Sequence, residues 1–164
     1  MNITKGSRLV MITSWIVVVL WVVLIFTFSV QTAEQSAGLS SRVTETIVKI
    51  VSWVTSMDYD VRAMELMVKQ IHNLVRKFAH GGLYLVLGIL VINSFMQTKT
   101  KGCKAYVYAV IFCAVYAVTD EAHQTFVAGR SGQISDIVID TAGAIIGISM
   151  HWIYKRSVKR DDSS

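Results

Sequence analysis

The sequence contains no proline and only two cysteines among its 164 residues. Without proline, no residue forces a kink or a break in a long helix. Cys103 lies near lysines and Cys113 lies in an apolar run, so the sequence indicates neither a disulfide framework nor a CxxC metal site. A Gly-rich phosphate loop, a serine nucleophile motif and an aromatic-basic surface for nucleic acid are also missing. These absences exclude several common classes of soluble enzymes and nucleic-acid-binding proteins.

Apolar residues dominate what is present. They make up 53% of the chain, and the mean hydropathy is +0.50. A helix needs about 20 apolar residues to cross a bilayer, and all its backbone groups must be hydrogen-bonded within the membrane. Four segments meet this requirement, at about residues 9–30, 78–98, 104–121 and 135–154. The sequence therefore predicts an all-α, polytopic membrane protein with one domain, residues 1–164, and a bundle of four transmembrane helices.

The basic residues predict the orientation of this bundle. Four crossings place both termini on one side of the membrane. The basic clusters at the termini and between spans two and three all fall on that side, which by the positive-inside rule is the cytoplasm. They comprise Lys5, Arg8, Lys99, Lys101, Lys104, Lys155, Arg156, Lys159 and Arg160. We expect both termini to be cytoplasmic and the first helix to be an uncleaved anchor.

Residues 31–77 then form an extracytoplasmic loop. Apolar residues recur at helical spacing in 43–54 and again in 61–75, which predicts two amphipathic helices on the membrane surface or over the mouth of the bundle. We expect the second to continue into span two, because neither proline nor glycine interrupts the chain between Val61 and His80.

Ionisable residues occur near the outer ends of the spans. Only 15 residues separate Lys104 from Asp120, too few at about 1.5 Å each to cross a hydrocarbon core of about 30 Å. Asp120 must therefore lie at or below the outer margin, and the same reasoning applies to Asp140. The sequence predicts one polar pocket in the outer leaflet, lined by His80, Asp120, Glu121, His123, Gln124, Arg130, Asp136 and Asp140.

Helical spacing assigns these side chains to faces. Asp136 and Asp140 are four residues apart, as are His80 and Tyr84, and Lys77 lies beside His80. Each polar stripe is expected to face protein. A GxxxG pair, Gly143 and Gly147, continues the aspartate stripe and predicts close approach of a neighbouring helix.

Three segments contain a distinctive combination of polar residues: Arg76-Lys77-Phe78-Ala79-His80 with Tyr84, the run from Asp120 to Phe126 with Gly129-Arg130, and Asp136 and Asp140 with Gly143. Together they resemble the VanZ-like family of membrane proteins. The resemblance extends over about residues 28–147. It departs from the family pattern at Ala128, where many members have proline, and at Leu83, where many have glutamate. It implies a small multi-helix protein of the bacterial plasma membrane, whose family namesake is associated with low-level resistance to teicoplanin.

The first functional hypothesis is recognition of an amphiphile at the outer leaflet, either a lipid-linked cell-envelope precursor or a lipoglycopeptide. Arg130 and Lys77 would hold its phosphate or carboxylate, and the apolar walls would contact a lipid tail. Besides this ligand we expect contact with membrane lipid and none with nucleic acid; no residue pattern specifies the oligomeric state. The ligand-binding candidates are Lys77, Tyr84, Asp120, Gln124, Arg130 and Asp136.

Two alternatives remain open. In the first alternative, the protein is a hydrolase or transferase that acts on a lipid head group. Its catalytic candidates are His80, Glu121, His123 and Asp140. A metal-assisted version would draw ligands from His80, Glu121, His123, Asp136 and Asp140, but there is no HExxH spacing, and we expect no cofactor and no metal. In the second alternative, the charged groups are only a structural ion-pair network.

Overall fold

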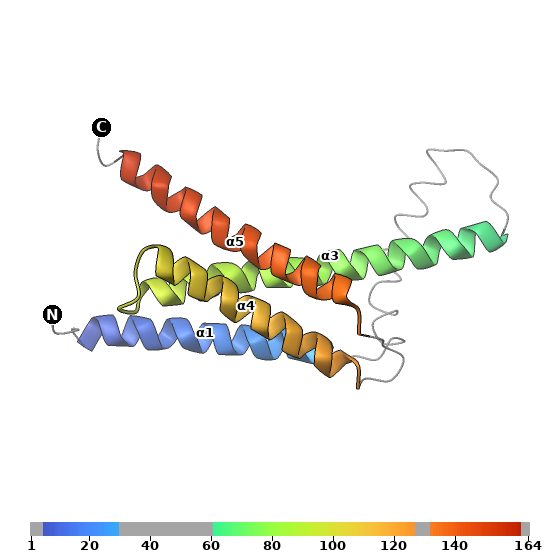
Figure 1. Ribbon diagram of the computed structural model, residues 1–164, viewed down its shortest axis with the longest axis horizontal. Helices are drawn as coiled ribbons and strands as arrows, with labels where there is room; N and C mark the ends of the chain where they lie inside the picture. Colours follow the sequence, from blue (N-terminus) through green and yellow to red (C-terminus); the bar gives the residue numbers. More distant parts are fainter. Residues whose placement is uncertain (1–4, 30–60, 127–131, 162–164) are drawn as a thin grey trace.

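The computed structural model describes residues 5–29, 61–126 and 132–161, and every described element is a helix (Figure 1). The helices are α1 (Lys5–Ser29), α3 (Val61–Met96), α4 (Cys103–Gln124) and α5 (Ile134–Asp161). All four are long and apolar enough to cross a membrane, over Gly6–Ser29, Leu74–Met96, Cys103–Gln124 and Ile134–Val158. The predicted all-α fold with four spans is confirmed. The amphipathic helix expected at 43–54 lies outside the described residues.

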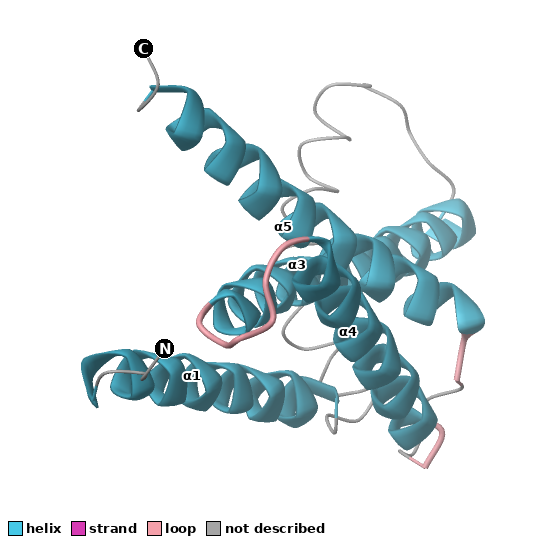
Figure 2. Cartoon of the chain, turned by 60° about the vertical axis from the view of Figure 1, so that its left-hand side comes forward, coloured by secondary structure: helices cyan, strands magenta, loops and turns pink. Residues whose placement is uncertain are grey.

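The four helices alternate in direction, so the N- and C-termini lie at the same end of the bundle (Figure 1). Helix α3 is the central element and packs against α1, α4 and α5. Within the described residues α1 and α5 share no contact, and α5 diverges from α1 toward its C-terminus (Figure 2). A tight turn with Gly102 at φ 66° joins α3 to α4, a backbone conformation that glycine adopts without strain.

Helix α3 is a single helix of 36 residues, about 54 Å long. The expected continuity between the amphipathic segment and span two is therefore observed. Residues 61–73 precede the apolar part of α3 and extend beyond the bundle, rather than lying across its mouth (Figure 1). The reason is local: with no helix-breaking residue before Gly81, the ladder of backbone hydrogen bonds continues.

Glycines set the close packing of α3 against α5. A Cβ atom added to Gly143 would collide with the carbonyl group of Gly81, and one added to Gly147 with the carbonyl group of Leu85. On α3, Gly88 meets the backbone of Ala144 in the same way. The predicted close approach along the GxxxG stripe is confirmed. Such contact between backbones is the main source of helix association in lipid, where apolar side chains gain little by leaving the hydrocarbon.

Helix α1 is attached by aromatic side chains. Trp21 donates a hydrogen bond to the carbonyl of Leu83 at 3.0 Å, and Tyr116 of α4 donates one to the carbonyl of Val22 at 2.8 Å. At the other end of the bundle, Trp15 packs edge-on against Phe95 with ring centroids 5.2 Å apart. These contacts hold α1 beside α3 and α4 and close one side of the bundle.

The outer surface is apolar. Phe78, Ile111 and Ile146 expose 74%, 53% and 54% of their surface, and most of α1 is similarly exposed. A soluble protein of this size would not leave so much apolar surface in contact with water. This distribution fits a bundle surrounded by hydrocarbon, in which the buried polar side chains form the exception.

Candidate functional site

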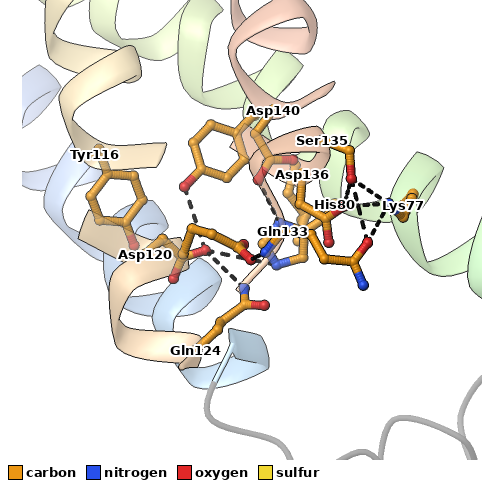
Figure 3. Close-up of polar contacts among 12 residues, drawn as sticks. Lys77, His80, Tyr116, Asp120, Gln124, Gln133, Ser135, Asp136 and Asp140 are labelled. Carbon is orange, nitrogen blue, oxygen red and sulfur yellow. Dashed lines mark hydrogen bonds and ion pairs between the residues drawn. The ribbon is translucent and has the colours of Figure 1, made fainter. Parts of the chain in front are cut away.

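Three helices bring ionisable side chains together at the end of the bundle opposite the termini (Figure 3). His80 of α3 lies between Asp140 of α5 and Asp120 of α4. Its Nδ1 atom is 3.1 Å from Asp140 Oδ2, and its Nε2 atom is 3.9 Å from Asp120 Oδ2. The side chains of the two aspartates are 1% and 4% exposed, for Asp120 and Asp140 respectively. The pairing across three helices agrees with the expectation that the polar stripes face one another.

Tyr84 and Gln124 complete the surroundings of Asp120. The Tyr84 hydroxyl donates to Asp120 Oδ2 at 3.5 Å, and the Gln124 amide donates to the same oxygen at 3.4 Å. Tyr84 lies one helical turn from His80, and their rings stack with centroids 5.9 Å apart. The Tyr84 ring also stacks with Tyr116, with centroids 5.8 Å apart. Both phenol rings thus form an ordered wall between the carboxylates and the apolar core.

A second set of polar side chains, centred on Lys77, lies nearer the helix ends. Lys77 forms an ion pair with Asp136 at 2.5 Å. Its ammonium also donates to the Gln133 side-chain carbonyl at 3.0 Å and to the Ser135 hydroxyl at 2.8 Å (Figure 3). Lys77 and Asp136 each expose 19% of their side chains. These side chains connect α3 to the first turn of α5, and Lys77 and Asp136 line the same cavity as His80.

The carboxylate of Glu121 contacts the backbone before α5, whereas that of its neighbour Asp120 lies beside His80. Its carboxylate accepts a hydrogen bond from the backbone N–H of Gln133. The residue is buried, with 5% of its surface exposed. Glu121 therefore attaches the end of α4 to the start of the segment that leads into α5. This contact is structural in kind and does not place the carboxylate beside His80.

Two buried carboxylate oxygens lack hydrogen-bond partners among the described residues. They are Oδ1 of Asp120 and Oδ1 of Asp140. Burial of a polar atom without a partner is costly, and the cost is much higher for a charged group. Such atoms in a pocket indicate where a proton, a cation or a ligand donor would be stabilised.

A small cavity of about 10 Å³ lies beside His80 and Asp140. That volume is close to the minimum that accommodates one water molecule. The lining combines cationic, acidic and amide side chains with one aliphatic residue, and comprises Arg76, Lys77, His80, Gln124, Asp136, Ile139 and Asp140. The cavity therefore has room for a single water-sized atom or ion.

Of the residues predicted for the pocket, one lies elsewhere and one falls outside the described residues. His123 is half-buried against Phe26 of α1, with ring centroids 4.7 Å apart. Gln124, four residues after Asp120, shares its face, whereas the packing of α4 against α1 directs His123 toward Phe26. Arg130, the expected anion-binding residue, lies outside the described residues.

The structure adds residues that the sequence reasoning missed. Tyr116 precedes Asp120 by one turn and Gln124 by two, so a polar stripe along α4 was a usable signal. Arg76 belongs to the family motif and precedes His80 by one turn; it was not assigned to the predicted pocket, but it lines the cavity. Gln133 and Ser135, which bind Lys77, gave no signal because polar residues are ordinary in a loop before a helix.

The arrangement of His80, Asp120 and Asp140 suits two kinds of chemistry, proton transfer and metal binding. An imidazole held by a carboxylate on one nitrogen can transfer a proton through the other, as in hydrolases that orient a histidine with an aspartate. His80, Asp120 and Asp140 also offer ligand atoms that all lie within 4.8 Å of one another, which suits a metal ion. Asp120 is absent from the ligand set expected from the sequence, because spacing along one helix does not reveal which carboxylate faces His80.

Comparison with known proteins gives one result. A family model described as VanZ/LLP1 matches residues 14–155, which include all of α3 and α4 and most of α1 and α5. No curated protein and no solved structure matches the chain significantly.

Proposed function

The chain belongs to the VanZ/LLP1 family, and from this premise we propose that it binds the polar group of an amphiphile at the outer leaflet of the bacterial plasma membrane. The ligand is a lipid-linked cell-envelope precursor or a lipoglycopeptide, and binding contributes to low-level resistance to teicoplanin. Both termini are cytoplasmic in this proposal.

The observation that carries the proposal is the cavity lined by Arg76, Lys77, His80 and Asp140. Cationic side chains at the rim would attract a phosphate or carboxylate, and hydrogen bonds to a charged group are the stronger kind. The exposed apolar side chains around it, such as Phe78, would contact the lipid tail. Because the cavity holds about one water-sized group, a single ligand oxygen enters and the head group stays at the rim.

Alanine substitution in a bacterial host tests the proposal. Lys77→Ala and Arg130→Ala are expected to return teicoplanin susceptibility to that of cells without the protein, while membrane abundance is unchanged. Lys101→Ala, an exposed lysine at the opposite end, is the matched control and should keep resistance. Unchanged resistance in both test variants would count against the proposal. Direct binding of teicoplanin to the detergent-purified protein gives a second readout.

A second candidate function is a hydrolase or transferase for a lipid head group. The specific observation in its favour is the 3.1 Å contact between His80 and Asp140, which orients the imidazole for proton transfer. In this reading His80 removes a proton from the attacking hydroxyl or water, and Asp140 stabilises the imidazolium that results. Release of a water-soluble head group from a labelled lipid substrate, lost in His80→Ala, would distinguish turnover from binding.

The remaining alternative is a purely structural ion-pair network. Polar contacts between helices in membranes contribute about 1 kcal/mol or less each, which is a small return for burying several ionisable groups. This alternative predicts that variants lose abundance and resistance together, whereas the binding function predicts loss of resistance alone.

A further inference from the structure

Among the described residues, His80 is the only ion-pair partner of the buried carboxylates of Asp120 and Asp140, and the guanidinium of Arg76 lines the adjoining cavity. The other two acidic residues nearby have their own partners, because Lys77 pairs with Asp136 and the backbone of Gln133 donates to Glu121. Asp120 and Asp140 share the single imidazole of His80. One imidazole carries at most one positive charge, so two ionised carboxylates would exceed it.

The unpartnered oxygens show where a balancing charge would lie. Asp120 Oδ1 and Asp140 Oδ1 are both buried and accept no hydrogen bond from the described residues. A balancing ion would lie among the ligand atoms of the three side chains. The adjoining cavity, which His80 and Asp140 line, has room for the one water or ligand oxygen that would complete its coordination. A cation that coordinates both carboxylates would satisfy these atoms and offset the cost of burying them.

We propose that His80, Asp120 and Asp140 form a binding site for one divalent transition-metal ion, Zn²⁺ or Mn²⁺. This departs from the absence of a metal expected from the sequence, and the new observation is the position of Asp120. The inference shares its pocket with the proposed function and deepens it: the ion would be the group that receives the ligand's phosphate or carboxylate oxygen.

The spacing of the three ligand atoms is near what coordination requires. Two ligands of a tetrahedral ion at about 2.1 Å lie about 3.4 Å apart. His80 would coordinate through only one of its ring nitrogens, and one such ligand atom from each of the three residues lies within 4.8 Å of the others. Rotation of the side chains would bring these atoms to the spacing that coordination requires. Imidazole with carboxylates suits zinc and manganese, and three protein ligands leave a position open for water or substrate.

Metal content of the full-length protein tests the site. The protein is purified in detergent with a tag that contains no histidine, and its zinc and manganese are measured by mass spectrometry. We expect about one equivalent of one of these ions, removed by a chelator and restored by adding back Zn²⁺ or Mn²⁺. Removal should lower Tm and restoration should raise it, because an ion that binds only the folded state stabilises it.

Substitution of the two aspartates tests whether the ion binds at this cluster. Asp120→Asn and Asp140→Asn should each weaken metal binding by at least about 100-fold, since loss of a direct ligand exceeds the 10- to 100-fold effect of an outer-shell partner. His151→Asn is the matched control, because His151 lies on α5 but contacts Tyr106 at the opposite end, and should retain the ion. Retention of metal by both aspartate variants would overturn the site.

Metal content and Tm of the wild-type protein test the proposed metal site even if the variants misfold. Wild-type protein that carries no metal, and whose Tm does not respond to chelator, Zn²⁺ or Mn²⁺, overturns the proposal. Teicoplanin binding measured on the same samples separates the two ideas: a metal-free protein that still binds teicoplanin retains the proposed function and loses the metal site. A loaded protein that fails to bind teicoplanin gives the reverse result.

Discussion

Gly143 of α5 packs its α carbon against the carbonyl group of Gly81 of α3, with no space for a side chain between them. This contact lies one turn from Asp140 and directly after His80, so it sets the distance between the two helices that supply the pocket. The close approach of the backbones and the position of the polar cluster are consequences of the same packing.

Gly143→Ala should destabilise the bundle because a methyl group there forces α3 and α5 apart. Insertion of a methyl group into a tightly packed interface costs about 1–3 kcal/mol. Thermal unfolding in detergent measures the effect. Gly82→Ala is the control, since Gly82 follows Gly81 on α3 and nothing lies within 4 Å of a Cβ atom at that position. Equal stability of the two variants would show that α3 and α5 are not in contact along this stripe.

The Lys77–Asp136 ion pair should contribute little to stability. Both side chains are partly exposed, and pairs of this kind contribute about 1 kcal/mol or less. A double-mutant cycle with Lys77→Met and Asp136→Asn, measured by reversible unfolding in mixed micelles, should give a coupling energy of that size. Neither single variant should lose membrane abundance. Collapse of abundance in either one would favour the structural network over ligand binding.

His80 and His123 should differ in effect although both were predicted for the pocket. His80→Ala removes the contacts with Asp120 and Asp140 and should abolish resistance to teicoplanin. His123→Ala removes a ring that packs on Phe26 and should leave resistance close to wild type. Drug susceptibility and membrane abundance of both variants provide the measurement. Loss of resistance in His123→Ala at normal abundance would require His123 to enter the pocket.

Cysteine labelling tests the orientation. Cys103 is exposed at the start of α4 and Cys113 is buried, so a maleimide reagent should modify only Cys103. If the termini are cytoplasmic, a membrane-impermeant maleimide should label Cys103 only after the cells are permeabilised. Thr125→Cys in a Cys103→Ser background places an exposed thiol at the other end of α4 and should label in intact cells. The reverse pattern would invert the topology and move the pocket to the inner leaflet.

The sequence predicted the four spans well because membrane-spanning helices are determined by length and apolarity, which are local properties. The aspartate stripe and the GxxxG pair were also readable, since both follow from the helical repeat within α5. His123 was misplaced because the rotation of α4 about its axis depends on packing against α1, through contacts such as Tyr116 with Val22. The pairing of Asp120 with His80 was hidden for the same reason: it joins separate helices.

The length of α3 has a mechanical consequence. About 20 residues of a helix suffice to cross the hydrocarbon, so the first turns of this helix lie beyond the apolar segment while remaining one rod with the turn that carries Lys77 and His80. A rod without a hinge transmits tilt and rotation along its whole length. A force applied to the protruding end of α3 would therefore move Lys77 and His80 relative to the pocket residues of α4 and α5.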